Sequence, residues 1–346
     1  MTADHEPLLE GLLSGEHRAL ARTISLIEDR SPGYRDLVSR LYAHAGNASV
    51  VGVTGSPGAG KSTLVDKLAE AYRERGETVG IIAIDPSSPF TGGAVLGDRI
   101  RMASTVGDMD VFVRSMSARG SLGGLSTATA DAVTAMDAFG KDRIIIETVG
   151  AGQNEIDIVK TADTVAVLVP PGSGDEVQTL KAGILEIADV FVVNKADRTG
   201  ADRTVQELLE MVDLGQGGPF GGVSGHHGPT ADGTGDEPAD DGWSTPVLKT
   251  VATDGTGLEA LLEALEDHQK HLANSGEGDR RGRRRAAELL RTLVREDVNS
   301  HLEESLEQAG GLESLAEDIR TGRTDPYTVA DEVVEPLERC LEELER

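Results

Sequence analysis

The chain is poor in cysteine, with one such residue among its 346, and only 3% of it is aromatic. Because Cys340 has no partner within the chain, an intramolecular disulfide and a cysteine-rich metal site are both excluded. No apolar run approaches the length needed to cross a bilayer. The first residues, Met1 to Glu6, do not show the basic segment followed by an apolar one that is typical of a secretory signal. We therefore expect a cytoplasmic protein without a membrane partner.

Positive charge is also scarce. Lys plus Arg number 33 and Asp plus Glu number 60, which gives a formal net charge of -27. Such a charge repels polyanions and argues against a nucleic-acid partner. The acidity, the few aromatic residues and the excess of arginine over lysine are typical of a surface adapted to high salt, so we expect a halophilic protein.

The most informative segment is a glycine-rich loop that ends in lysine and serine. It fills every position of the pattern G-x-x-x-x-G-K-[ST] with Gly55, Ser56, Pro57, Gly58, Ala59, Gly60, Lys61 and Ser62, and Thr63 follows. Residues 48–54 predict a buried strand before the loop, and residues 63–75 an amphipathic helix after it. In that context the loop amides surround the phosphates of a nucleoside triphosphate, the lysine reaches the β- and γ-phosphates, and the serine hydroxyl helps to hold Mg²⁺. The alternative, a glycine-rich turn with an accidental lysine, does not account for the flanking strand and helix.

A second motif chooses the base. Asn194, Lys195, Ala196 and Asp197 directly follow the apolar strand predicted at 190–193. The Asp197 carboxylate can accept hydrogen bonds from the N1–H and the exocyclic amine of guanine, whereas adenine offers neither donor there. The motif therefore predicts GTP as the substrate, against the alternative of an ordinary polar loop after a strand.

Acidic residues after other strands are candidates for the metal site. The apolar strand predicted at 144–146 leads into Glu147, shortly before Gly150, so Glu147 could hold Mg²⁺ and the Gly150 amide could meet the γ-phosphate. The alternative is a solvated acid at the end of a strand. Asp85 and Asp98 are further candidates for the metal or the attacking water, although Asp85 could simply cap the turn before Pro86.

Hydrolysis by such a site depends on positioning and charge neutralisation. The residues that we expect to take part in catalysis are Lys61, Asp98, Glu147 and Gln153, where Gln153 would orient water. The residues that we expect near the metal are Ser62, Asp85, Asp98 and Glu147. No arginine finger can be assigned among Arg99, Arg101 and Arg119.

Strand and helix signals alternate from about residue 46 to 272, which predicts an α/β P-loop NTPase domain with a mainly parallel central sheet. Its further strands are expected at 79–84, 111–113, 164–169 and 247–251. Residues 1–45 predict an N-terminal extension of two helices, broken at Ser31, Pro32 and Gly33. Residues 273–346 predict a C-terminal helical region, with breaks at Pro326 and Pro336.

Two segments have more than one interpretation. Residues 215–242 contain His226 and His227, but without a third histidine or a cysteine they are expected to be a flexible acidic insertion and not a metal site. Residues 280–285 are the only basic cluster. Within so acidic a chain, we expect an intramolecular or partner-facing role for this cluster in preference to RNA binding.

Several runs together resemble the MeaB or ArgK type of GTPases, accessory proteins of methylmalonyl-CoA mutase that are also labelled LAO/AO transport system ATPases. Besides the two nucleotide motifs, the resemblance depends on residues 18–22, 25–28, 52–55, 85–89, 97–102, 119–125, 147–153 and 183–189. It spans most of the chain. One departure is Val251 and Ala252 where the family usually has Ser and Ala, and a backbone N–H at Ala252 could still contact the base.

The resemblance implies a homodimeric GTPase that acts as a chaperone for an adenosylcobalamin-dependent acyl-CoA mutase of the methylmalonyl-CoA type. GTP hydrolysis would gate loading of the cofactor and protect or reactivate the mutase, and the cobalamin would lie on the partner. By the same resemblance, Asp85, Asp98 and Glu147 surround Mg²⁺, the segment 175–188 moves on contact with the partner, and residues 273–346 form the dimerisation region. The acidic insertion has no recognised counterpart.

Two other functions remain open at this point. The older transport-ATPase label suggests a protein kinase, although the guanine motif argues against it and transfer of labelled phosphate to a protein would support it. A metal-delivery GTPase of the nickel-insertion type shares the general architecture, but it would need a cluster of cysteine or histidine.

Overall fold

The computed structural model describes residues 5–85, 108–117, 122–148, 150, 161–172, 187–217 and 242–344. The chain divides into two compact units, residues 1–285 and residues 286–346. Each unit is described by itself.

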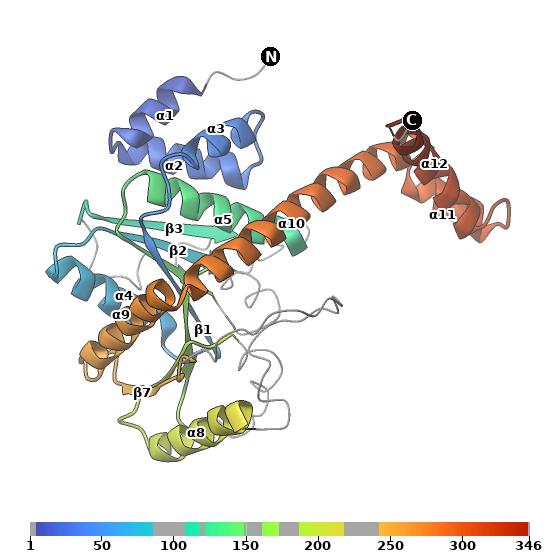
Figure 1. The fold of residues 1–346 in the computed structure, drawn as a ribbon. Coiled ribbons are helices and arrows are strands. Elements are labelled where there is room, and N and C mark those ends of the chain that lie inside the picture. The colour runs from blue at the N-terminus through green and yellow to red at the C-terminus, as the bar shows by residue number, and fades with distance from the viewer. Residues whose placement is uncertain are drawn as a thin grey trace. The chain divides into compact units, whose positions relative to one another are not determined.

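The first unit is built on a seven-stranded sheet (Figure 1). The strands are β1 (Ser49–Gly55), β2 (Val79–Asp85), β3 (Val111–Ser117), β4 (Arg143–Glu147), β5 (Thr164–Val169), β6 (Val190–Asn194) and β7 (Val247–Thr250). They lie in the order β3-β2-β4-β1-β5-β6-β7, and every neighbouring pair is parallel. The predicted α/β fold with a parallel central sheet is therefore confirmed.

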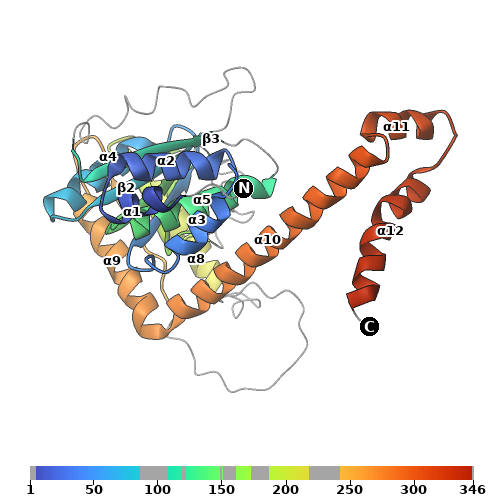
Figure 2. The same cartoon turned by 90° about the horizontal axis from the view of Figure 1, so that it is seen from above.

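Helices cover both faces of this sheet, which is why its inner strands are mostly apolar. Along β5, Val165, Val167 and Val169 belong to one buried core, whereas Ala166 and Leu168 belong to the other. The second core also contains α4 (Lys61–Glu74) and α9 (Leu258–Ser275). The first contains α5 (Leu122–Ala138) and α8 (Ala201–Gly217), together with the N-terminal helices. The view from above shows those N-terminal helices lying over α5 (Figure 2).

The N-terminal extension has three helices where the sequence predicts two. They are α1 (Glu6–Leu13), α2 (His17–Glu28) and α3 (Tyr34–Leu41). The expected break between residues 28 and 34 is confirmed, but a break at Gly15 was missed. Gly15 has φ 86°, its N–H donates to Leu12 O, and the Glu16 N–H donates to Gly11 O. This pair of bonds ends α1 with a left-handed glycine.

The C-terminal region is helical, as expected, and consists of α10 (Glu277–Gln308), α11 (Leu312–Arg320) and α12 (Pro326–Leu344). Helix α10 begins in the first unit and continues into the second. Pro326 opens α12, because a first-turn proline loses no helical hydrogen bond. The break expected at Pro336 is wrong, since α12 continues through it. Among the described helices, none is long and apolar enough to cross a membrane.

The expected acidic insertion at 215–242 lies almost wholly outside the described residues. Residues 215–217 form the last turn of α8, and the description resumes at residue 242. His226 and His227 are in the part that is not described.

Candidate nucleotide-binding site

The glycine-rich loop connects the end of β1 to the start of α4, at the centre of the sheet. Two of its glycines are required by close contacts. Gly55 has φ 140°, and a Cβ there would lie 2.1 Å from Leu168 O on β5. Gly60 has φ 93°, and a Cβ there would lie 2.5 Å from Asn194 Nδ2. The loop is therefore packed against the carboxyl ends of β5 and β6, where ligands bind in open α/β sheets.

Lys61 is the first residue of α4 and is only 6% exposed. Its ammonium donates to Gly55 O at 2.7 Å and to Ser56 O at 3.0 Å, so the side chain lies over the loop that it follows. A buried cation at a helix N-terminus, beside a turn of backbone amides, favours a phosphate group at this position.

Ser62 and Glu147 are brought together by the pairing of β1 with β4. Val53 is the parallel partner of Glu147, and the Ser62 hydroxyl donates to Glu147 Oε1 at 2.6 Å. Glu147 is 8% exposed. The structure thus places a hydroxyl and a carboxylate from two predicted metal-site residues side by side, and both are oxygen ligands of the kind that Mg²⁺ prefers.

A pair of threonines, which sequence analysis missed, fixes the position of Gly150. The Thr54 hydroxyl lies 2.9 Å from Gly150 O, and the Thr148 hydroxyl lies 2.9 Å both from that oxygen and from Thr54 Oγ1. Thr54 and Thr148 are fully buried. Gly150 is therefore held beside the end of β1, next to the loop. Both threonines adjoin a recognised motif, which is the signal that could have identified them.

The side chain of Asn194 connects three segments by hydrogen bonds. It is 1% exposed, and its Nδ2 donates to Ala59 O at 2.8 Å. Its Oδ1 accepts from the Thr250 hydroxyl and from the Ala252 N–H, each at 3.1 Å. The end of β6 is thus tied to the glycine-rich loop on one side and to the loop after β7 on the other.

The rest of the guanine motif also lies at the carboxyl end of the sheet. Lys195 has φ 60°, and its ammonium donates to Gly58 O at 2.6 Å. Asp197 is exposed, whereas Ala252 is buried. Because the Ala252 N–H already donates to Asn194 Oδ1, this amide links the two loops. Direct contact of that amide with the base stays a prediction.

The structure describes three predicted site residues only in part or not at all. Asp98 and Gln153 lie outside the described residues, and only the backbone of Asp85, the last residue of β2, is described. Asp85 lies at the carboxyl end of the sheet, as Glu147 does, and pairs with Ser117 of β3.

Comparison with known families agrees with this geometry. Residues 20–307 match the family described as "Methylmalonyl Co-A mutase-associated GTPase MeaB". The chain belongs to the MeaB family of GTPases. A nucleoside-triphosphate site at the β1–α4 loop is what this family membership and the P-loop fold lead one to expect.

Proteins from distant organisms match this chain over most of their own length. A protein described as a putative GTPase from Pyrococcus horikoshii is 46% identical over 96% of this chain and 98% of its own. The "Methylmalonic aciduria type A homolog, mitochondrial" of Caenorhabditis elegans is 29% identical over 95% of this chain and 82% of its own. The crystal structure of an "LAO/AO transport system kinase" has the same fold, with a TM-score of 0.65 and 23% identity over 98% of this chain and 99% of that one.

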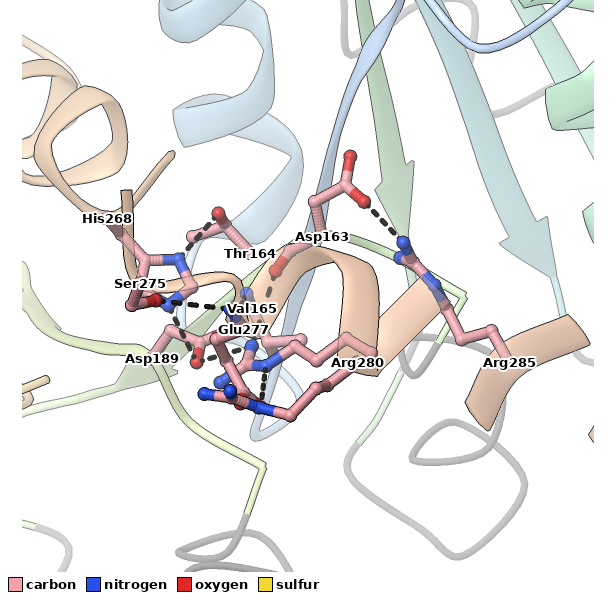
Figure 3. Close-up of polar contacts among 10 residues, drawn as sticks. Asp163, Thr164, Val165, Asp189, His268, Ser275, Glu277, Arg280 and Arg285 are labelled. Atoms are coloured by element: carbon pink, nitrogen blue, oxygen red, sulfur yellow. Dashed lines mark hydrogen bonds and ion pairs between the residues drawn. The ribbon is translucent and has the colours of Figure 1, made fainter. Parts of the chain in front are cut away.

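The MeaB-family chain also has a polar cluster at the opposite, amino-terminal edge of its sheet (Figure 3). Asp163 and Asp189 directly precede β5 and β6. Asp163 Oδ2 accepts from the Val50 N–H at 3.0 Å, and Asp189 Oδ2 accepts from the Val165 N–H at 2.8 Å. Each aspartate therefore holds the first residues of the neighbouring strand.

His268 and two arginines complete this cluster. His268 is fully buried, with Nδ1 2.8 Å from Thr164 Oγ1 and Nε2 3.2 Å from Asp189 Oδ1. Arg281 donates to Asp189 Oδ1 at 3.0 Å, and Arg285 donates to Asp163 Oδ1 at 2.6 Å. Burial alone would raise the pKa of the Asp189 carboxyl, but the hydrogen bond and charge of His268, together with Arg281, hold it below its ordinary value.

These contacts give the basic cluster 280–285 an intramolecular role, which is one of the two that sequence analysis favoured. Arg280 pairs with Glu277 at 2.8 Å in addition to the contacts of Arg281 and Arg285. None of the residues of α10 is buried. Polar contacts, and not an apolar face, therefore hold the first turns of α10 against the sheet.

Proposed function

We propose that this member of the MeaB family binds GTP together with Mg²⁺ and hydrolyses it to GDP and phosphate. The observation that carries the proposal is the meeting of three motifs at one edge of the sheet. Asn194, in the guanine motif, donates to Ala59 of the phosphate loop, and Ser62 of that loop donates to Glu147. The proposed base, phosphate and metal sites would thereby share a single hydrogen-bonded frame.

The donor set fits Mg²⁺. The Ser62 hydroxyl and the Glu147 carboxylate are hard oxygen ligands, only 2.6 Å apart, at the mouth of the phosphate loop. Asp85 is proposed as a further ligand on its position at the end of β2, and Asp98 on sequence alone. A bound Mg²⁺ would neutralise charge on the phosphates during transfer.

The residues of the chain itself would act by positioning. Lys61 would exchange its two carbonyl partners for phosphate oxygens, and the loop amides would fix the β-phosphate. Asp197 would accept from the guanine N1–H and the exocyclic amine, which excludes adenine. Gln153 would orient the attacking water. Without an assigned arginine finger, slow intrinsic hydrolysis is expected.

We further propose that the client is an adenosylcobalamin-dependent acyl-CoA mutase of the methylmalonyl-CoA type. Support comes from the family description and from the relative named for methylmalonic aciduria. In this role GTP hydrolysis would gate loading of the cofactor and protect or reactivate the mutase.

A homodimer is also proposed, with part of the contact on α10. Leu290, Val294 and Val298 follow one another at a spacing of four residues, and they are 63%, 53% and 37% exposed. This spacing places them on one face of the helix as an uncovered apolar stripe, which a second copy could bury. Light scattering of Val294→Asp against wild type tests this, and a wild-type monomer at micromolar concentration would refute it.

The deciding experiment is GTP hydrolysis in high salt, with and without an acyl-CoA mutase of this cofactor class from the same source. We expect complex formation and faster hydrolysis when the mutase is present. Turnover that is indifferent to the mutase would refute the client, and absence of GTP turnover under both conditions would refute the enzymatic role.

A further inference from the structure

The three N-terminal helices contribute no described residue to the nucleotide site. Helix α2 packs on α5 and β3, and its residues Ala19, Leu20 and Ile24 are buried in the core. This packing explains the apolar members of the run 18–22, one of the segments on which the resemblance to the family depends. It does not explain the two arginines of that run.

Arg18 and Arg22 lie one helical turn apart on the exposed side of α2. Neither makes a hydrogen bond or an ion pair with any residue that the structure describes. Other arginines of this region are paired, as Arg40 is with Glu6 at 2.5 Å and Arg114 is with Glu28. In a chain with 60 acidic and 33 basic residues, carboxylates are in excess, so two neighbouring arginines that pair with none of the described carboxylates are available to a partner.

The same two arginines line a cavity of about 440 Å³ at the surface of α1 and α2. The other lining residues include His5, the acidic side chain of Glu16 and the apolar side chains Leu8, Ala19 and Leu26. The cavity therefore combines an apolar surface with two guanidinium groups and one carboxylate, so positive charge is in excess there. This is the composition expected of a site for an amphipathic anionic segment, whose apolar side chain would enter while its carboxylates pair with arginine.

We propose that this cavity docks an acidic amphipathic helix of the mutase client, with Arg18 and Arg22 pairing with carboxylates one turn apart on that helix. The identity of the partner rests on the proposed function. Guanidinium forks match carboxylates in bidentate geometry, and their spacing of one turn matches acidic residues at i and i+4. The chain carries a net charge of -27, so the rest of its surface repels an acidic partner. This cavity would therefore also determine where such a partner binds.

The test uses the full-length double variant Arg18→Glu with Arg22→Glu. The matched control is Arg203→Glu on α8, an arginine whose side chain is 82% exposed and paired with Glu207. We expect the double variant to lose at least about tenfold in affinity for the mutase, together with stimulation of GTP hydrolysis. Basal hydrolysis and GDP affinity should be unchanged, because neither arginine lies in the nucleotide site. The control should behave as wild type in all of these measurements.

A second experiment tests the docking site independently of the identity of the client. A synthetic helical peptide with Glu at i and i+4 around leucine serves as the probe, and its binding is followed by fluorescence polarisation. If the wild type binds the peptide through Arg18 and Arg22 but not the mutase, the docking site stands and the client is wrong.

Two outcomes would overturn the docking site itself. One is that the double variant binds the mutase as tightly as the wild type does. This holds also if the substitutions change self-association instead. The other is failure of the wild type to bind both the mutase and the peptide.

Discussion

At the scale of single residues, Lys61 offers the most direct test of the phosphate site. Its ammonium is buried against the carbonyls of Gly55 and Ser56, which is where a phosphate would compete for it. We predict that Lys61→Ala abolishes GTP hydrolysis, because the charge on the transferred phosphoryl group loses its main protein partner. Steady-state phosphate release checks this. The control is Lys67→Ala on the same helix, where Lys67 pairs with Glu70 at 2.6 Å; retained turnover in Lys61→Ala would remove the residue from catalysis.

Alanine variants of Gly60 and Gly58 distinguish the effect of backbone strain from the effect of a contact with the guanine motif. Both have positive φ, 93° and 77°, but a Cβ on Gly60 would meet Asn194 Nδ2 at 2.5 Å, whereas a Cβ on Gly58 would meet nothing within 4 Å. Each alanine should cost about 1–2 kcal/mol for the left-handed backbone. Only Gly60→Ala should also displace Asn194, and we predict a further loss of about tenfold in GTP affinity. Titration with a fluorescent guanine nucleotide checks this, and equal losses in the two variants would contradict it.

At the scale of helices and strands, local sequence signals predicted most of the architecture. Each strand of four to seven residues contains an apolar run, so its position could be inferred. Sequence analysis assigned Ser62 and Glu147 to one metal site, and the structure brings them into contact because motifs after parallel strands converge at one edge of the sheet. The break at Gly15 was missed because the apolar pattern of α1 and α2 runs on across a single left-handed glycine.

The polar cluster at the other edge could not be predicted in the same way. Asp189, His268 and Arg281 come from three separate elements, and no short motif relates their positions in the sequence. Their proximity is a consequence of how α9 and α10 pack against the sheet. A sequence signal for it exists only in hindsight, as two isolated aspartates directly before apolar strands.

Asp189 also gives this cluster a testable contribution to stability. Its side chain is 7% exposed, and Asp189→Asn removes the negative charge that lies against Arg281 and His268. We predict that the free energy of unfolding falls by about 3 kcal/mol at neutral pH, near the lower end for a broken buried pair because Arg281 is one-third exposed. The control is Asp163→Asn. Its side chain is 28% exposed, so we expect a loss of about 1 kcal/mol.

The sign of the pH dependence follows from the lowered pKa of Asp189. The pKa of this carboxyl is near 3.8 in the unfolded chain and lower in the folded one. The stabilisation is therefore complete above the unfolded value and is lost as the pH falls through the folded one. Urea unfolding at neutral pH and at about pH 3 should show the difference between wild type and Asp189→Asn shrinking in acid. A difference that does not depend on pH would show that packing, and not charge, is responsible.

At the scale of the whole molecule, repulsion within a chain of net charge -27 destabilises the fold, whereas surface ion pairs stabilise it. Many of the described pairs include an exposed side chain, such as Arg203 with Glu207, and each of these contributes at most about 1 kcal/mol. Salt weakens both the pairs and the general repulsion. With 27 uncompensated negative charges on one chain, repulsion is the larger effect, so screening should stabilise the fold.

We therefore predict that the melting temperature rises by about 5–10 °C between about 0.05 M and 2 M KCl, which corresponds to a few kcal/mol of relieved repulsion. Differential scanning calorimetry over a series of KCl concentrations checks this. Screening is nearly complete once the Debye length reaches about 3 Å at 1 M, so most of the rise should occur below that concentration. A rise that continues steadily beyond it would indicate exclusion of salt from the protein surface instead. Full stability in low-salt buffer would mean that the acidic composition is not an adaptation to salt.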